Sequence, residues 1–564
     1  MENFKPQKMV GWFDVKQLAS TATKAILSSV FGAYADKRET IAAVNSFKVY
    51  DYSHEKELWI DYMADTGDGF NSTYTMAHLI SQKKIQVKEV GNKKSEFDLP
   101  KSKILMLGGD QVYPVATRET YQNKFVGPFS AAFPRDQNVP EDHLFAIPGN
   151  HDWYDGLSSF IKLFCQNRAV GNWRTQQNRS YFAIKVTENT WLWAIDIQLE
   201  ADIDKPQLDY FDKVSSDYMQ PGNNIILCTA EPSWVYNTSV RNDSSYKNLR
   251  VFESWFIEEK KMKLLVSISG DTHHYAHYIQ NTKDSVLHKI TAGGGGAFLH
   301  PTHNLPEILV NLREGVFSLK KTFPEKSDSQ KLTFGAVLFP YYNWSFGLFM
   351  ASIYLLFVWG VYISSGISGL NIIEEIRVFG LSDWHHIANM FTKALSYNPV
   401  TLIIILTLIL GFWKFTDTAS YKSDKIGLLG AIHGLLHVCL MFGLLLFFPY
   451  FNYTILHISI KPLMNITLAL EIFFLGGLLS GVLVGFYLLL SNLLFKIHDN
   501  EAFSSMKIEG YKNFLRMKIK DDVLTIFPIG VKNIAKWKSS EDGFKTDHPL
   551  QPELIDEPII VKLN

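Results

Sequence analysis

The residues most able to do chemistry stand in the stretch 144–156, LFAIPGNHDWYDG. Its first four residues form an apolar run that predicts a buried strand, and the Pro-Gly pair that follows is a turn signal. Asn150, His151 and Asp152 come directly after the turn. They would bring an amide oxygen, an imidazole and a carboxylate to the carboxyl end of a strand, where open sheets expose their working groups.

Four further apolar runs predict strands that end in polar turns in the same way. They cover residues 57–64, 103–107, 224–229 and 263–269, and the turns after them are rich in Gly, Asp or Pro, which favour turns. One such cluster would be an ordinary surface loop, whereas five in succession indicate a site. In chain order, the turns after the four runs carry Asp65 and Asp68, then Asp110 and Tyr113, then Glu231, and finally Asp271 and His273.

Other strand signals complete a sheet-based domain in the N-terminal half. Residues 181–186 and 190–196 predict a hairpin. Residues 286–291 predict a strand that ends in four glycines, 293–296. This glycine loop either lets backbone N–H groups approach a phosphate or makes a tight connection.

The order of the five clusters resembles the metallophosphoesterase superfamily, with its calcineurin-like and purple-acid-phosphatase-like branches. The family series is D-x-G/H, GD-x-x-Y, GNH(D/E), a single His and GHxH, and the resemblance covers about residues 55–300. It implies an α/β fold, a metallophosphoesterase β-sandwich flanked by helices. It also implies two divalent metal ions, about 3.5–4 Å apart, that clamp a phosphoryl group and generate a hydroxide that attacks it directly. The organisation of the whole chain looks like that of the calcineurin-like membrane phosphoesterases of bacteria.

The resemblance assigns a first metal ion to four side chains. Asp110 matches the bridging carboxylate, which two like charges so close together need. Asp65 and His273 match ligands of the first ion. Tyr113 stands where the purple-acid-phosphatase branch has a metal-binding tyrosine.

The second metal ion is where this sequence departs from the family. Asn150 matches a family ligand, but Glu231 replaces the lone His and Asp271 replaces the first His of GHxH. With Asp110, the ligands of the second metal ion would all be oxygen atoms. Oxygen ligands suit hard ions such as Mg²⁺, Mn²⁺ or Ca²⁺ better than zinc. Because both replacements are still ligands, we expect a changed metal preference rather than a dead site. The ions expected are Mn, Mg, Fe or Zn.

Two neighbouring positions complete the implied site. His151 matches the family's non-ligand histidine, which contacts the phosphate and protonates the leaving oxygen, and the ordinary pKa of an imidazole suits that task. Gly67 replaces the common His of D-x-H. Asp68 then either compensates as a ligand or shapes the turn.

Three arginines in nearby loops are candidates for binding the substrate. Arg118, Arg174 and Arg179 could each form the fork that binds phosphate, or could be solvated surface residues. His274 and His277 either line the site or are ordinary surface or core histidines.

Composition narrows the class of protein. The chain has 564 residues with a formal net charge of −1, so no nucleic acid binding is expected. Three cysteines provide neither a disulfide framework nor a zinc-finger spacing, which fits a reducing compartment. The N-terminus has no continuous apolar segment of a signal peptide. Residues 12–34 suit an amphipathic helix that either packs on the catalytic domain or lies on a membrane surface.

Long apolar runs in the C-terminal half predict an α-helical transmembrane domain. The expected spans are residues 344–364, 399–415, 427–448 and 466–495. Four spans put the catalytic domain and the C-terminus on one side of the membrane. Lysines are more numerous on that side, so the positive-inside rule predicts that both are cytoplasmic.

The predicted spans carry residues of two unusual kinds. His433 and His437 lie one turn apart, and they either form a neutral hydrogen-bonded pair or serve a lipid-headgroup, metal or proton site together with Glu471. The small-residue face of the last span allows close helix packing, within one chain or in a homo-oligomer. That face consists of Gly477, Gly481 and Gly485.

We therefore expect an N-terminal helical segment (1–50), a catalytic domain (51–335), a transmembrane domain (336–496) and a soluble tail (497–564). The tail has a hairpin signal in residues 514–531 and is expected to pack on the catalytic domain.

The favoured function is a membrane-anchored metallophosphoesterase that hydrolyses a phosphate mono- or diester, with a lipid-linked substrate at the cytoplasmic face. One alternative is an enzyme with a soluble substrate such as a nucleotide. The other is a membrane receptor, transport or regulatory protein whose phosphoesterase domain binds metal but is inactive.

Overall fold

The computed structural model divides by internal contacts into two units. The sheet unit comprises Met1–Val10, Ala19–Gln330 and Lys507–Asn564, and the helical unit comprises Gly11–Leu18 and Lys331–Met506. Most of the amphipathic helix predicted over residues 12–34 lies outside the described residues, although residues 15–20 are helical. The structure describes residues 4–20, 23, 38–89, 92–197, 203–239, 245–281, 286–367, 372–379, 383–416, 424–541 and 543–563.

Two large sheets form the centre of the sheet unit. Among the described residues the first has nine strands, in the order β1 (Tyr50–Asp51), β9 (Phe182–Lys185), β10 (Thr190–Ala194), β11 (Asn224–Cys228), β12 (Lys263–Ser269), β14 (Val286–Ala292), β13 (Tyr275–Asn281), β16 (Gly315–Phe323) and β15 (Ile308–Leu312). The second has the order β4 (Asn92–Pro100), β3 (Lys84–Glu89), β21 (Glu553–Leu554), β18 (Val523–Val531), β17 (Lys512–Lys520), β2 (Glu57–Met63), β5 (Ile104–Leu107), β6 (Asp142–Ala146), β8 (Trp173–Thr175) and β7 (Ala169–Val170), with β22 (Ile559–Lys562) on β18. A separate ribbon pairs β19 (Trp537–Ser540) with β20 (Gly543–Thr546).

A continuous apolar core joins the two sheets. It contains Ile60, Met106 and Phe145 from the second sheet together with Leu192 and Ile226 from the first, all nearly or fully buried. The other face of each sheet is covered by helices, so the central strands are buried on both faces and read as unbroken apolar runs. The predicted α/β sandwich flanked by helices is therefore confirmed.

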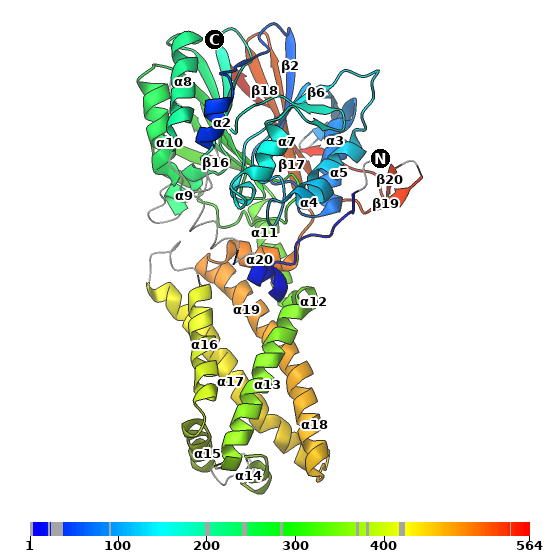
Figure 1. Ribbon diagram of the computed structural model, residues 1–564, viewed down its shortest axis with the longest axis vertical. Coiled ribbons are helices and arrows are strands. Elements are labelled where there is room, and N and C mark those ends of the chain that lie inside the picture. The colour runs from blue at the N-terminus through cyan, green and yellow to red at the C-terminus, as the bar shows by residue number, and fades with distance from the viewer. Residues whose placement is uncertain are drawn as a thin grey trace. The chain divides into compact units, whose positions relative to one another are not determined.

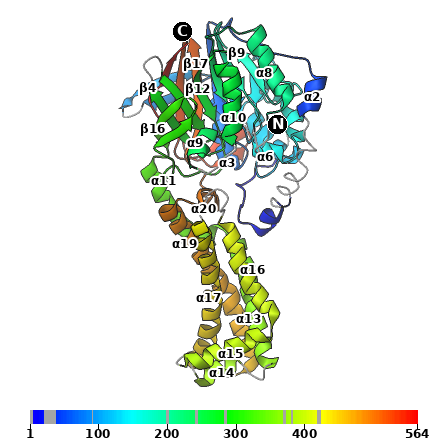
Figure 2. The same ribbon diagram turned by 90° about the vertical axis from the view of Figure 1, so that its left-hand side faces the viewer.

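Helices cover the two outer faces of the sandwich (Figures 1 and 2). Those against the second sheet include α3 (Phe70–Ser81), α4 (Arg118–Tyr121), α5 (Gly127–Ala132) and α7 (Ser158–Phe164). Those against the first include α8 (Lys205–Asp217), α9 (Ser233–Ser239) and α10 (Ser245–Glu253). The short helices α2 (Arg38–Val44) and α6 (Asn150–Trp153) complete the unit.

The C-terminal hairpin belongs to the middle of the second sheet. Strand β17 pairs antiparallel with β18 along its whole length, and its other edge pairs with β2, where Leu515 lies opposite Tyr62. Figure 1 shows the orange strand β18 in the sandwich with the blue β2. The sheet unit is thus built from chain segments on both sides of the helical unit's sequence.

The helical unit consists mainly of long apolar helices. Its described helices are α12 (Phe339–Tyr342), α13 (Trp344–Ile367), α14 (Ile372–Phe379), α15 (Trp384–Ser396), α16 (Pro399–Phe415), α17 (Asp424–Thr454), α18 (Lys461–Glu471), α19 (Gly477–Phe495) and α20 (Asp499–Met506), and α11 (Lys326–Thr333) crosses the boundary between the units in sequence.

Among the described residues, three helices rather than the expected four are long and apolar enough to cross a membrane. They are Trp344–Gly366, Ile426–Thr454 and Lys461–Phe495, and they indicate membrane association. The fourth candidate, Pro399–Phe415, is apolar but has only 17 residues. At 1.5 Å per residue it is roughly 26 Å long, shorter than a hydrocarbon core of about 30 Å.

The glycine face of the last span packs inside the chain. A methyl group added at Gly477 would lie 2.9 Å from the carbonyl oxygen of Gly347, and one added at Gly485 would lie 2.5 Å from that of Ala336. At Gly481 it would lie 3.1 Å from Pro340. Of the two predicted alternatives for this face, these contacts favour close packing within one chain over a homo-oligomer.

The intramembrane histidines form a hydrogen-bonded group. The Nε2 atoms of His433 and His437 are 3.1 Å apart, and His437 Nδ1 is 2.7 Å from the hydroxyl of Tyr354. Glu471 accepts a 2.7 Å hydrogen bond from Asn452. These contacts favour the interpretation that the histidines lock the helices together.

Candidate active site

The strand ends carry the predicted site residues. Asp65, Asp110 and Asn150 follow β2, β5 and β6, which are parallel neighbours in the second sheet. Glu231 and Asp271 follow β11 and β12, which are parallel neighbours in the first. Because parallel strands end at the same edge, each sheet gathers its polar turns there.

All three of these aspartates have left-handed backbone conformations. The φ angles are 58° at Asp65, 50° at Asp110 and 69° at Asp271. Such a conformation is uncommon for a residue with a side chain and is concentrated at functional sites. Here the three residues lie just beyond the ends of β2, β5 and β12.

Four residues of the first predicted metal group meet at one hydroxyl. The Tyr113 oxygen lies 3.0 Å from Asp65 Oδ1, 3.2 Å from Asp110 Oδ2 and 2.9 Å from His273 Nε2. All four side chains are almost fully buried. The tertiary structure therefore brings together four residues that lie up to 208 positions apart in the sequence (273 − 65).

His273 is oriented as a metal ligand requires. Its Nδ1 is 2.7 Å from the carbonyl oxygen of Phe298. A carbonyl only accepts, so Nδ1 carries the proton and Nε2 keeps its lone pair toward Tyr113 and the carboxylates. Burial lowers the pKa of His273 well below that of an ordinary imidazole, which keeps the ring neutral.

Glycines make the space that the carboxylates occupy. A methyl group added at Gly149 would lie 2.2 Å from Asp110 Oδ1, and one added at Gly293 would lie 2.4 Å from Asp65 Oδ2. At Gly270 it would lie 2.9 Å from the same Asp65 oxygen. In the sequence, these glycines stand beside Asp and Asn, which suggests only that they form turns. In the structure, they also allow the carboxylates to pack closely against the backbone.

The carboxylates repel one another in a buried setting. Burial, followed by repulsion from Asp110 and Asp271, raises the pKa of Asp65 well above that of an ordinary carboxyl. Burial and repulsion from Asp271 raise the pKa of Asp110 to about 8. Such a cluster is costly without a cation, because buried charges need partners.

The second predicted metal group is less tightly joined. Asp271 accepts hydrogen bonds from the Tyr236 hydroxyl, and its own N–H donates to Asp65 Oδ2 over 2.8 Å. Asn150 Oδ1 is buried and has no hydrogen-bond partner among the described residues. Glu231 lies at the adjacent strand end and accepts a 3.2 Å hydrogen bond from Ser233. The link from Tyr236 to Asp271 was not predicted, since only the fold brings helix α9 to this edge.

His151 is held by its backbone and its ring. Its N–H donates to Asp110 Oδ1 over 2.8 Å, and its Nδ1 lies 2.7 Å from the carbonyl oxygen of Pro114. Burial lowers its pKa to about 4, below the ordinary value of an imidazole. A phosphate anion beside the ring would raise this pKa again.

Asp152 organises the turn that presents Asn150 and His151. One carboxylate oxygen accepts from the backbone N–H of Gly149 over 2.9 Å and of Gln111 over 3.3 Å. The other accepts from the Tyr121 hydroxyl. It is fully buried, so its contribution is to fix the loop.

Several predicted side chains are used elsewhere. Asp68 accepts a 2.7 Å hydrogen bond from the N–H of Val10 and faces Lys124 Nζ at 3.9 Å, which favours its role in shaping the turn over the role of a metal ligand. Arg174 binds Glu141 through two hydrogen bonds of 2.9 and 2.7 Å. Arg179 donates to the carbonyl oxygen of Asn45 over 2.8 Å.

These contacts favour a structural role for Arg174 and Arg179 over phosphate binding, because their guanidinium groups already have partners. Arg118 is exposed at the first position of α4, and the structure brings it to none of the clustered carboxylates by a described contact. Among the other candidates, His274 is buried, and His277 pairs with His288 over 3.0 Å and with Asp556 over 3.2 Å.

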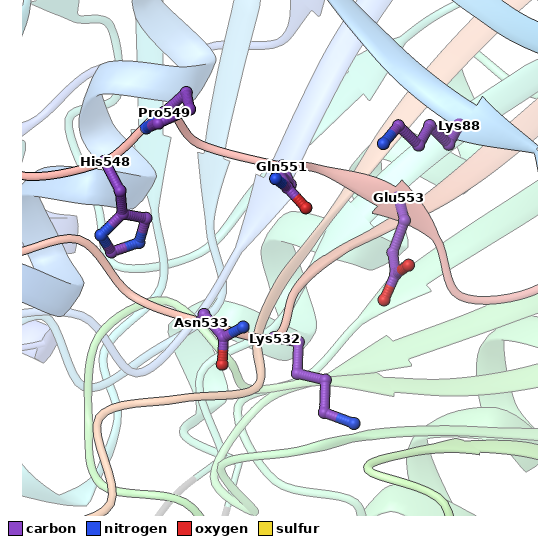
Figure 3. Close-up of a pocket in the computed structure, with 7 residues that line it drawn as sticks. All are labelled: Lys88, Lys532, Asn533, His548, Pro549, Gln551 and Glu553. Carbon is purple, nitrogen blue, oxygen red and sulfur yellow. The ribbon is translucent and has the colours of Figure 1, made fainter. Parts of the chain in front are cut away.

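An open groove of about 400 Å³ elsewhere on the sheet unit is a separate feature (Figure 3). No predicted metal ligand is among the described residues that line it. Its charged groups have both signs, and it holds no pair of carboxylates. The lining residues are Lys88, Lys532, Asn533, His548, Pro549, Gln551 and Glu553.

The donor set at the strand ends fits divalent cations. Within the described residues, no three His, Cys, Asp or Glu side chains already surround a single point at the spacing of a metal site. The Tyr113 hydroxyl stands among Asp65, Asp110 and His273 instead. The repulsion among the carboxylates, the lone pair that His273 Nε2 turns toward them and the unpartnered oxygen of Asn150 are the features that a cation would satisfy.

Part of the chain matches a known protein family. Residues 11–275 match the model of the calcineurin-like phosphoesterase family. The search of curated proteins finds no match. A solved purple acid phosphatase from yellow lupin (Lupinus luteus) seeds is similar with 11% identity and a TM-score of 0.30, over 47% of this chain and 48% of that one, so the alignment spans about half of each protein. On the family match, residues 11–275 form a calcineurin-like phosphoesterase domain.

Proposed function

We propose that this chain is a membrane-associated, metal-dependent phosphoesterase that hydrolyses a phosphate mono- or diester, and that the ester is linked to a lipid. The observation that carries the proposal is the meeting of Asp65, Asp110 and His273 at the hydroxyl of Tyr113. It supports a metal centre at the strand ends of a domain whose family hydrolyses phosphate esters.

Each group of residues has a distinct task in this proposal. Two divalent ions, when bound, would polarise the phosphoryl group and lower the pKa of the attacking water. Asp65, Tyr113 and His273 would hold one, and Asn150, Glu231 and Asp271 the other. Asp110 would serve both, because its two oxygens already face different partners, Tyr113 and the N–H of His151. His151, anchored on Pro114, would contact the phosphate and assist the leaving group.

The hydrolytic activity is tested with p-nitrophenyl phosphate and bis-p-nitrophenyl phosphate on metal-stripped full-length protein. Mn²⁺, Mg²⁺, Fe²⁺ and Zn²⁺ are added back singly, with Asp110→Asn as the variant and Arg174→Ala as the control. We expect turnover that needs metal, survives in the control and is lost in Asp110→Asn. Metal-independent turnover, or equal turnover in Asp110→Asn, would overturn the proposal in favour of a metal-binding protein that is not an enzyme.

The lipid part of the proposal rests on the long apolar helices. A phospholipid presented in mixed micelles should be hydrolysed with a higher kcat/KM than the corresponding water-soluble headgroup ester. Equal rates would instead support the soluble-substrate alternative.

The sheet unit contains strands from before and after the apolar helices, which supports an even number of membrane crossings. Strand β2 precedes the apolar helices and β17 follows them, yet both belong to one sheet. In this proposal both flanks lie on the same side of the membrane, and α16 crosses as the fourth span. The lysines on that side favour the cytoplasm. Reporter fusions at the C-terminus and at residue 370 should report opposite sides, and a C-terminal fusion that reports the outside would contradict the assignment.

A further inference from the structure

The glycine loop after β14 lies directly behind the Asp65 carboxylate. Gly293 leaves room for Asp65 Oδ2, as the 2.4 Å approach of an added methyl group shows. The loop is also tied to the Asp65 segment: the N–H of Gly295 donates to the Ala64 carbonyl over 2.8 Å, and that of Ala297 donates to the Asp65 carbonyl over 2.9 Å. Any shift of the loop would therefore move a predicted metal ligand.

Strand β17 holds the other side of the same loop. The N–H of Asn513 donates to the Gly294 carbonyl over 3.0 Å. The ammonium group of Lys512 donates to the Ala297 carbonyl over 2.5 Å. The loop is thus fixed between Asp65 and two consecutive residues that stand more than 440 positions later in the chain (512 − 65 = 447).

Lys512 is a fully buried basic side chain near several carboxylates. Burial lowers its pKa to about 7, whereas Asp68, Glu509 and Asp65, in decreasing order of effect, favour its charged form. A buried ammonium group is costly and is retained only where fixed charges or hydrogen bonds compensate it. Here it offsets part of the negative charge behind the predicted metal ligands.

The buried side chain of Asn513 does not contribute to stability in the usual way. It is fully buried, and neither polar atom of its side-chain amide has a hydrogen-bond partner among the described residues. An unpartnered buried amide is unfavourable, and an apolar residue would cost less. Only glycine at position 294 leaves room for it, because an added methyl group would lie 2.1 Å from Asn513 Nδ2. Local rules broken in this way are typical of functional sites.

We propose that the strand after the apolar helices completes the phosphoesterase centre, with Lys512 and Asn513 as positioning residues that hold loop 293–297 and thereby Asp65. This inference rests on the proposed function and deepens it. The phosphoesterase family match ends at residue 275, so it includes neither the loop nor the strand. The centre is therefore complete only when the chain has passed through the helical unit and its tail has joined the sheet.

The test uses full-length protein with Lys512→Met and Asn513→Ala, and with Lys518→Met as the matched control. Lys518 lies on the same strand, but it is partly exposed and faces Glu57 at 3.7 Å, at the start of β2, whereas the glycine loop lies beyond the end of β2. Three quantities are measured: the Mn²⁺ dissociation constant of metal-stripped protein, kcat and KM for the best p-nitrophenyl ester, and the melting temperature.

We expect both variants to weaken Mn²⁺ binding about 10- to 100-fold and to lower kcat by a similar factor, with KM little changed, because residues behind metal ligands act through ligand orientation. Lys518→Met should match the wild type. Unchanged Mn²⁺ affinity and kcat in both variants would overturn the inference, as would an equal loss in Lys518→Met.

The design separates this inference from the proposed function. If wild-type protein binds Mn²⁺ but hydrolyses no ester, the proposed function fails, while the Mn²⁺ affinities of the variants still decide the positioning role. If Lys512→Met does not fold, Asn513→Ala decides alone, since it removes no charge. A lowered melting temperature in Asn513→Ala with wild-type Mn²⁺ affinity would show a structural role only and would overturn the inference.

Discussion

The two halves of the predicted metal centre are held in different ways. Around Asp65 and His273, protein groups satisfy the ligands: the Tyr113 hydroxyl links them, and the Phe298 carbonyl fixes the histidine ring. Around Asn150 and Asp271 the contacts are sparser, and the Asn150 oxygen has no described partner.

The two halves also differ in how closely their residues match the family series. In the tightly joined half Asp65, Asp110, Tyr113 and His273 match the family series and Gly67 replaces a common His, whereas in the other half Glu231 and Asp271 replace two histidines. Where the ligands have few contacts with one another, one ligand can be replaced without disturbing the rest. Where the ligands share hydrogen bonds, a replacement disturbs several of them. We infer that the first half sets the geometry and the second half sets the metal preference.

The largest effect is expected where the halves meet. Asp110→Asn removes the shared charge, and we expect kcat/KM to fall on the order of 10³-fold or more, since a metal ion supplies several kcal/mol of transition-state stabilisation. Metal analysis of the purified variant should show loss of both ions. Loss of only one ion would separate the halves and show that Asp110 does not serve both.

The tyrosines of the two halves provide a matched pair. Tyr113→Phe removes a hydroxyl that contacts three predicted ligands, whereas Tyr236→Phe removes one that, among the described residues, bonds to Asp271. We expect roughly a 10- to 100-fold loss of metal affinity or activity in Tyr113→Phe and a smaller loss in Tyr236→Phe. Metal titration followed by steady-state kinetics measures both, and the reverse order would contradict the comparison.

Restoring histidines should move the metal preference. The double variant Glu231→His and Asp271→His introduces nitrogen ligands, so activity with Zn²⁺ should rise relative to Mg²⁺ by about 10-fold or more. The ratio of kcat/KM values with the two metals reports the change. An unaltered ratio would mean that these positions do not hold the second ion.

The smallest effect is expected away from both halves. Arg174→Ala breaks a partly exposed pair with Glu141, so stability should fall by about 1 kcal/mol or less and kcat/KM should stay within about two-fold of the wild type. Urea unfolding and kinetics check this. A large rise in KM would restore Arg174 as a phosphate-binding residue.

Local pattern determined much of this protein. The sequence predicts that Asp65, Asp110, Asn150 and Asp271 lie at strand ends. It can do so because an apolar run followed by Gly and Asp is a signal that spans only a few residues. The α/β sandwich and the apolar helices follow from the same kind of signal. A resemblance in the order of those clusters was enough to indicate the phosphoesterase family.

Only the tertiary structure decided which side chains have other partners. Arg174 and Asp68 look free in the sequence, yet Glu141 and Val10 bind them across 33 and 58 positions. The glycine face of the last span is covered by the chain's own helices, which no periodicity reveals. Lys512 and Asn513 reach the centre because β17 pairs with β2. Pairing between strands so far apart in the sequence depends on how whole sheets pack. No local sequence pattern reports that packing, so only the folded structure shows it.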